Sequence, residues 1–195
     1  MCIRDRYRRV LKPSGVIVLS ASQPFTTKVV ASNFEWFRYE WIWRKNIATG
    51  HASVKLRPMK QHENILVFAP KQPKYYPQML PGKPYKKKRK AKDDSGSNYQ
   101  LGTLRTDTVN EGTRYPVSVL DVAREVGLHP TQKPVALWEY LIRTYTNEGD
   151  TVLDNCCGSG TTGVACQNSG RNFIQFELNP EYCEIARGRL KPLPR

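Results

Sequence analysis

Three apolar runs in the first third of the chain predict β-strands. Residues Gly15–Ala21 ("GVIVLSA") are rich in β-branched side chains and follow the turn sequence "KPSG". The segment "FRYEWIWRK" alternates with period two, which predicts one buried sheet face, rather than a base-stacking surface, made of Phe37, Tyr39, Trp41 and Trp43. Residues Glu63–Pro70 ("ENILVFAP") are the third run, and "QPFTTKVVASN", between the first two, is predicted to be a helix.

The last third has the most regular pattern. The segment "TQKPVALWEYLIRTYT" carries an apolar stripe at helical spacing, with Pro134 suited to the first turn. A short strand "DTVLDN", a glycine turn, a helix "TTGVACQNSG" and a strand "NFIQFE" follow. Asn179 is a natural cap for a final helix, "PEYCEIARGRL". This β-α-β order predicts two parallel strands joined by a right-handed crossover.

The middle of the chain differs in character. Between Lys71 and about Glu111, prolines recur at Pro73, Pro77, Pro81 and Pro84, and the run "KKKRKAKDDSGSN" follows them within the same segment. Such a segment has too little apolar surface for a core of its own, so we expect a long loop-like insertion. One further short strand is predicted in "RYPVSVLDV". The chain thus divides into a first core part (7–70), a basic insertion (71–115) and a second core part (116–195).

The net charge of the chain indicates what kind of partner it binds. The 195 residues include 31 Lys and Arg against 17 Asp and Glu, a formal net charge of +14 at pH 7. This excess favours a polyanionic partner, and nucleic acid in particular. The longest apolar run is far too short for a membrane span, and no signal peptide is expected. The five cysteines form no CxxC pair, so we expect reduced thiols in a cytosol-like compartment and no metal site.

The segment "DNCCGSGTTG" (Asp154 to Gly163) contains a GxGxxG pattern that two cofactors can use. A nicotinamide dinucleotide is the first, because Glu177 ends the next strand, where a carboxylate binds ribose hydroxyls. However, a carboxylate at Asp154 repels a pyrophosphate. S-adenosylmethionine suits the same turn better, since it carries an ammonium and a sulfonium and no phosphate. The nicotinamide-dependent oxidoreductase stays open as an alternative.

The segment "HPTQKPVALWEYLIRTYTNEGDTVLDNCCGSGTTGVA" resembles the C-terminal half of site-specific DNA amino-methyltransferases of the permuted beta class. These enzymes modify adenine N6 or cytosine N4. Their cofactor loop reads "D-P-F-x-G-S-G-T-T", and here Asn155 and Cys156 replace Pro and Phe. The segments "RRVLKPSGVIVLSASQPF" and "KQHENILVFAP" are similar to upstream family segments. The resemblance implies an incomplete α/β Rossmann-like methyltransferase fold, with a mixed, mostly parallel sheet and a basic loop insertion.

The resemblance also implies a set of residues that bind S-adenosylmethionine. Those expected to line the cofactor pocket are Asp154, Gly158, Gly160, Thr161 and Glu177. Those expected to approach the methionine end of the cofactor are His129, Thr131 and Lys133. For Lys133, the alternative is an ordinary exposed lysine at a helix start.

The family's catalytic "[DNS]-P-P-[YFW]" motif is missing, because the chain contains no Pro-Pro pair. "SQPF" (Ser22 to Phe25) lies after the apolar strand and is a poor substitute. We therefore name no catalytic residue and expect Met1 to Arg6 to lie outside the family sequence. An opening in the sheet with exposed apolar edges would follow. Such a chain is expected to bind cofactor poorly and to transfer no methyl group in a radiolabel assay.

The densest positive charge lies in "KPYKKKRKAK", from Lys83 to Lys92. We expect it to contact the phosphates of double-stranded DNA, in the region that selects the target sequence, through Lys86, Lys87, Lys88, Arg89 and Lys90. A solvated loop and a localisation signal are the alternatives. A nucleic-acid-binding module without catalysis also remains open for the whole chain. The expected location is the cytoplasm of a bacterium or phage host.

Overall fold

The computed structural model describes residues 3–88 and 107–190. It forms two compact units, one made of Met1–Tyr76 together with Val117–Arg195 and the other of Pro77–Pro116. The first unit begins with helix α1 (Ile3–Val10). None of the helices in the described part of the chain is long and apolar enough to cross a membrane.

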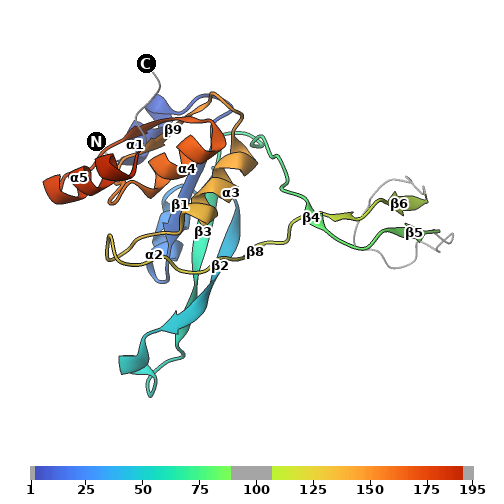
Figure 1. The fold of residues 1–195 in the computed structure, drawn as a ribbon, viewed down its shortest axis with the longest axis horizontal. Coiled ribbons are helices and arrows are strands. Elements are labelled where there is room, and N and C mark those ends of the chain that lie inside the picture. The colour runs from blue at the N-terminus through green and yellow to red at the C-terminus, as the bar shows by residue number, and fades with distance from the viewer. Residues whose placement is uncertain (1–2, 89–106, 191–195) are drawn as a thin grey trace. The chain divides into compact units, whose positions relative to one another are not determined.

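The first unit is built on a four-stranded sheet with the order β1-β3-β2-β8 (Figure 1). The strands are β1 (Ile17–Ala21), β2 (Phe37–Thr49), β3 (Lys60–Phe68) and β8 (Val119–Asp121). Strand β3 is antiparallel to both of its neighbours, whereas β2 and β8 are parallel. The sheet is therefore mixed as predicted, but two of its three strand pairings are antiparallel, so the expectation of a mostly parallel sheet is wrong for it. Its three longer strands correspond to the three predicted runs.

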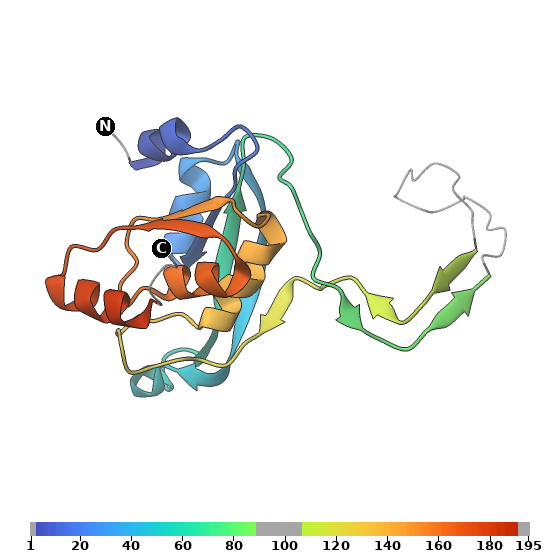
Figure 2. The ribbon, with the colours of Figure 1, turned by 45° about the horizontal axis from the view of Figure 1, so that its top comes forward.

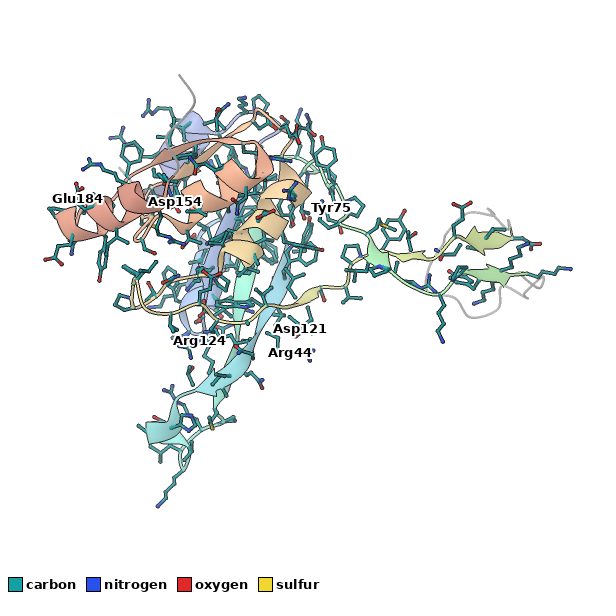
Figure 3. All side chains as sticks on the ribbon, viewed as in Figure 1. Arg44, Tyr75, Asp121, Arg124, Asp154 and Glu184 are labelled. Carbon is teal, nitrogen blue, oxygen red and sulfur yellow. The ribbon has the colours of Figure 1, made fainter. Side chains whose placement is uncertain are left out.

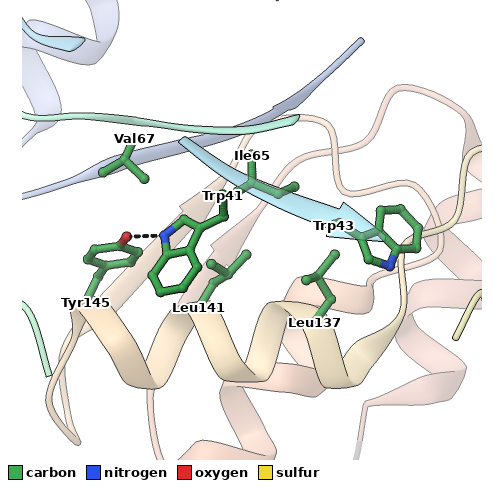
Figure 4. Packing of buried hydrophobic residues seen from close by; sticks show 7 residues of the cluster. All are labelled: Trp41, Trp43, Ile65, Val67, Leu137, Leu141 and Tyr145. Carbon is green, nitrogen blue, oxygen red and sulfur yellow. Dashed lines mark hydrogen bonds between the residues drawn. The ribbon is translucent and has the colours of Figure 1, made fainter. Parts of the chain in front are cut away.

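Helices cover both faces of this sheet (Figures 1 and 2). Helix α3 (Val135–Tyr145) packs on one face, and helix α2 (Phe25–Ser32) packs on the other. The α3 side buries seven residues, shown in Figure 4: Trp41, Trp43, Ile65, Val67, Leu137, Leu141 and Tyr145. Each large apolar side chain buried in this way contributes roughly 1.5–3 kcal/mol.

One member of the predicted aromatic face lies on the opposite side. The pairing of β2 with β3 shifts register between Phe37 and Tyr39. This irregularity turns Phe37 toward the α2 face, where its ring meets that of Phe68 edge-on at 5.6 Å. The prediction of one aromatic face is therefore right for Tyr39, Trp41 and Trp43 and wrong for Phe37, because strict alternation holds only while the register is unbroken.

The β-α-β unit predicted near the C-terminus is confirmed. Strands β9 (Thr151–Asp154) and β10 (Asn172–Gln175) are parallel and are joined through helix α4 (Thr161–Ser169). Helix α5 (Pro180–Arg189) follows, and the side chain of Asn179 accepts a hydrogen bond from the Glu181 N–H at 2.8 Å. The predicted cap is thus present.

Among the described residues, β9 and β10 pair only with each other and do not join the four-stranded sheet. The absence of the catalytic motif predicts an opening in the sheet, and the separation of β9 and β10 from the other four strands agrees with it. Apolar side chains on this two-stranded ribbon are exposed, Leu153 to 43% and Ile174 to 51%. Because Leu153 and Ile174 are paired across the two strands, they form an uncovered apolar patch on one face of the ribbon.

The second unit has more order than its composition predicts. Strands β4 (Leu80–Pro81) and β7 (Thr113–Arg114) form one antiparallel pair, and β5 (Tyr85–Lys87) and β6 (Thr108–Asn110) form another. The Arg114 guanidinium lies 4.8 Å from the Tyr85 ring centre and donates to Asn110 Oδ1 at 2.6 Å. These polar and cation–π contacts hold the strands together, since none of the described residues of this unit belongs to a buried apolar cluster.

The hydrogen bond at the centre of the α3 face gives a stability prediction. Trp41 Nε1 donates to the Tyr145 hydroxyl at 2.6 Å (Figure 4). That hydroxyl in turn donates to the Tyr39 hydroxyl at 3.0 Å. Tyr145→Phe leaves the buried indole N–H without its acceptor, so we expect a loss of roughly 1–3 kcal/mol in the free energy of unfolding. Tyr115→Phe is the control, because Tyr115 is 73% exposed. Equal urea-denaturation midpoints for the two variants would contradict the prediction.

Candidate functional site

The glycine turn between β9 and α4 needs glycine at two positions. Gly158 and Gly160 have φ angles of +52° and +78°, a region that other residues rarely adopt. A Cβ atom at Gly160 would lie 2.8 Å from the Cβ of Ala186. A Cβ atom at Gly158 would lie 3.2 Å from Cδ2 of His129. The turn therefore packs closely against α5 on one side and against the HPTQKP segment on the other.

Backbone amides of this turn are already used within the protein. Two donate to carboxylates, Cys156 N to Asp154 Oδ1 at 3.1 Å and Gly158 N to Glu177 Oε2 at 2.8 Å. Two more donate to backbone carbonyls, at 3.0 Å for Cys157 and 2.9 Å for Gly160. A phosphate-binding turn instead points its amides at the ligand. Here two of the turn amides bind carboxylates of the protein instead.

Asp154 and Glu177 are fixed by further hydrogen bonds. Thr162 Oγ1 donates to Asp154 Oδ2 at 2.5 Å. Glu177 Oε1 accepts from the backbone N–H groups of Leu178 and Asn179, each at 2.9 Å. The N–H groups of Asn179 and Gly158 are the main reason that the pKa of the Glu177 carboxyl is lowered, so Glu177 is ionised at neutral pH. Each carboxylate keeps lone pairs for a ligand.

Two cysteines of the glycine turn, Cys156 and Cys157, lie in surroundings that disfavour their thiolate forms. Burial, reinforced by the negative charges of Asp154 and Glu177, raises the pKa of the Cys157 thiol to about 11. Burial also raises the pKa of Cys156. Both thiols therefore remain protonated at neutral pH, and only a thiolate is a good nucleophile or metal ligand. The described residues also hold no cluster of three His, Cys, Asp or Glu side chains suited to a metal ion.

Arg189 supports the turn from helix α5. Its Nη1 donates to Ser159 O at 2.7 Å and to Thr161 Oγ1 at 3.2 Å. The side chain of Thr161 is thus buried and directed at a protein partner, while its backbone stands at the start of α4. Sequence reasoning missed Arg189, because an arginine in the last turn of a helix is also typical of an ordinary C-terminus.

The HPTQKP segment brings His129 to the glycine turn. Its ring also packs edge-on against Tyr182 of α5, with ring centres 4.4 Å apart. The backbone N–H of Thr131 donates to His129 Nδ1 at 3.2 Å, so in the neutral ring Nε2 carries the proton. His129, the glycine turn and Glu177 therefore lie together, and the positive charge of a protonated His129 would lower the Glu177 pKa further.

Lys133 lies in a partly buried ion-pair cluster. Its Nζ is 3.0 Å from Glu63 Oε2, and Lys45 Nζ is 2.6 Å from Glu63 Oε1. The side chains of Lys45, Glu63 and Lys133 are only 10–18% exposed, so Lys133 is not an ordinary surface lysine. Burial by itself would raise the pKa of Glu63, but the two ammonium groups outweigh this effect and lower it. Lys133 Nζ also donates to Thr131 O at 3.3 Å, which connects the cluster to the HPTQKP backbone.

Two further residues hold the site and were not predicted. Glu125 Oε1 accepts from the Val135 N–H at 2.9 Å, which places a carboxylate at the N-terminus of α3. The Tyr7 hydroxyl donates to Asn155 Oδ1 at 2.9 Å, so α1 contacts the residue that follows Asp154. The two pairs are 10 and 148 residues apart in the sequence, and no helical or strand periodicity indicates either of them.

Comparison with known proteins identifies the family of this chain. A family model described as DNA methylase (N6_N4_Mtase) matches residues 3–188. The chain belongs to the N6/N4 DNA methylase family. The match begins at residue 3, inside the segment that we expected to lie outside the family sequence. It favours the methyl-donor interpretation of the glycine turn over the oxidoreductase.

Relatives in this family are bacterial Type II methyltransferases. The chain is 31% identical over 192 residues to M.Cfr9I of Citrobacter freundii, covering 98% of this chain and 55% of that protein. It is 32% identical over 193 residues to M.HpaI of Haemophilus parainfluenzae, covering 93% and 55%. The chain therefore spans about half the length of these relatives.

Solved structures of N6/N4 methylases have the same fold. The M1.HpyAVI–SAM complex is 28% identical and has a TM-score of 0.66, with 94% of this chain and 78% of that chain covered. The cytosine-N4-specific PvuII DNA methyltransferase has a TM-score of 0.68 over 93% of this chain and 66% of that chain. At 20% identity, the likeness to the PvuII enzyme concerns the fold alone. The Rossmann-like methyltransferase fold is thus confirmed.

The Lys45–Glu63–Lys133 cluster predicts a pH-dependent stability. Because the folded-state pKa of Glu63 is lowered, its contribution is present above the ordinary value of 4.5 and is lost as pH falls through the folded-state pKa. Glu63→Gln leaves two ammonium groups without their counter-ion, so at neutral pH we expect a loss of roughly 3 kcal/mol. The difference from the unmodified chain should shrink in acid.

Thermal melts from neutral to acidic pH measure this difference. Glu184→Gln is the control, because Glu184 forms only an exposed ion pair with Arg187 on α5. If Glu63→Gln and the unmodified chain differ by the same amount at every pH, the lowered pKa of Glu63 is wrong.

Proposed function

We propose that this chain supplies the S-adenosylmethionine-binding part of a bacterial, cytoplasmic DNA methyltransferase. The reaction is methyl transfer to an exocyclic amino group, adenine N6 or cytosine N4, in double-stranded DNA. One observation carries the cofactor assignment: Asp154 and Glu177 accept the amides of the glycine turn. The turn therefore presents fixed negative charge, which favours a cationic ligand over a pyrophosphate.

Within this proposal, Glu177 accepts hydrogen bonds from the ribose hydroxyls of the cofactor. Asp154 lies at the other side of the turn and attracts the positive charge of the methionine moiety. Gly158 and Gly160 give the turn its shape, because both have positive φ angles and both pack against protein atoms where a Cβ would collide. When bound, the cofactor supplies an electrophilic methyl group on its sulfonium.

The methionine end is assigned to His129, Thr131 and Lys133. The Nε2–H of a neutral His129 is a donor that suits a carboxylate, and Thr131 holds the ring in place because its N–H and its hydroxyl both contact Nδ1. Lys133 forms an ion pair with Glu63 and stabilises the HPTQKP segment through its hydrogen bond to Thr131 O. The side chain of Thr161 binds Arg189, so Thr161 is assigned to the cofactor pocket through its backbone at the start of α4.

Catalysis by the isolated chain is not part of the proposal. The 195 residues contain no Pro-Pro pair, so the family motif that holds the extruded base has no counterpart here. We keep the expectation that this chain alone binds the cofactor weakly and transfers no methyl group. Incorporation of a radiolabelled methyl group into mixed-sequence DNA would contradict it.

The cofactor assignment predicts the effect of neutral, same-shape substitutions. Asp154→Asn and Glu177→Gln each remove a carboxylate charge from the turn, and we expect each to weaken S-adenosylmethionine binding by roughly tenfold. Glu184→Gln removes an equal charge from an exposed part of α5 and is the matched control. Ligand-observed NMR titration suits weak binding. Equal affinity in all three variants would overturn the assignment.

The DNA assignment predicts a change in salt dependence. Of the five predicted contact residues, Lys86, Lys87 and Lys88 are described and exposed, whereas Arg89 and Lys90 lie outside the described residues. Replacing the three lysines by alanine should lower the slope of log affinity against log salt by up to about 0.9 per lost phosphate contact. The control removes equal charge from exposed lysines of the first unit, Lys12, Lys28 and Lys74. An unchanged slope would favour a solvated loop.

A further inference from the structure

The β2–β3 hairpin carries a basic tip that the proposed site does not use. The hairpin tip, residues 45–62, contains four Lys or Arg residues and two histidines but no Asp or Glu. In Figure 3 its side chains extend beyond Arg44 and away from helices α3, α4 and α5. Positive charge without acidic partners at the end of a projecting element favours an anionic partner.

Three cations in the tip are available for such a partner. Lys45 is paired with Glu63, but Lys55, Arg57 and Lys60 form no ion pair with any residue in the ranges 3–88 and 107–190. Lys55 and Arg57 are exposed, and Lys60 is half-buried. Lysine is depleted at protein–protein interfaces, so this composition favours nucleic acid over a protein partner.

Between these cations the tip presents an apolar side chain. Leu56 is 89% exposed, although hydrogen bonds fix the backbone around it. Gly50, at φ +99°, begins a 3-10 turn, and both Leu56 N and Arg57 N donate to Ser53 O, at 2.9 and 3.0 Å. A leucine held in this way by an ordered turn, with Lys55 and Arg57 on either side, has the character of an apolar side chain that enters a DNA groove.

We propose that the hairpin tip is a DNA-contacting element distinct from Lys86–Lys88. Lys55, Arg57 and Lys60 bind backbone phosphates, and Leu56 packs against base edges or sugars in the groove. The inference rests on the proposed function, because DNA is the partner that function requires. It adds a contact surface on the unit that holds the cofactor turn.

Two kinds of variant separate the charge from the apolar contact. Replacing Lys55, Arg57 and Lys60 together by alanine should lower the salt slope by roughly 2–3. Leu56→Ala should weaken binding by roughly fivefold or more and leave the slope unchanged, because it removes apolar area and no charge. The matched control is again the Lys12, Lys28 and Lys74 triple variant, which has the same net charge as the hairpin triple variant.

Fluorescence anisotropy of the 195-residue chain with labelled duplex DNA, from about 50 to 200 mM salt, measures both effects. The proposal is overturned if the hairpin and control triple variants give the same slope, or if Leu56→Ala binds like the unmodified chain. It also fails if the chain binds phosphatidylserine vesicles through this tip and not DNA. Titration of the same variants with S-adenosylmethionine separates this proposal from the proposed function. If the hairpin triple variant still binds the cofactor and its salt slope for DNA binding is unchanged, only the DNA contact of the hairpin tip is rejected.

Discussion

We propose that the hydrogen bonds between two carboxylates and the glycine turn decide what this fold binds. Asp154 ends β9 and Glu177 lies two residues beyond β10, so both carboxylates lie at the C-terminal end of this parallel pair. By accepting two of the turn amides, they use donors that a phosphate could bind and leave negative charge in their place. In the proposed function, the glycine pattern that serves dinucleotides elsewhere is therefore a turn for a cationic cofactor.

The rest of the first unit keeps this turn in position. Helix α3 is buried against β2 and β3 through the tryptophan face, and its N-terminus carries the HPTQKP segment. Glu125 and the Lys133–Glu63 pair fix that segment, which places His129 on Gly158. From the opposite side, Arg189 holds Ser159 and Thr161. Packing and polar contacts therefore converge on one turn.

The sequence predicted local order well and distant contacts poorly. The parallel β9–β10 pair and the Asn179 cap follow from short-range patterns and are confirmed. The displacement of Phe37 depends on a register shift with β3, which alternation within one strand does not reveal. The ion pair of Lys133 has its partner on a distant strand. The short strands of the second unit depend on Arg114 and Asn110, whose side chains replace an apolar core.

The central claim is that the turn selects a cationic, phosphate-free cofactor. A competitive NMR titration of the 195-residue chain with S-adenosylmethionine and NADH tests it directly, since both ligands contain adenosine and differ in charge. We predict that S-adenosylmethionine binds and that excess NADH does not displace it. Binding of NADH, with none of the methyl donor, would contradict the account.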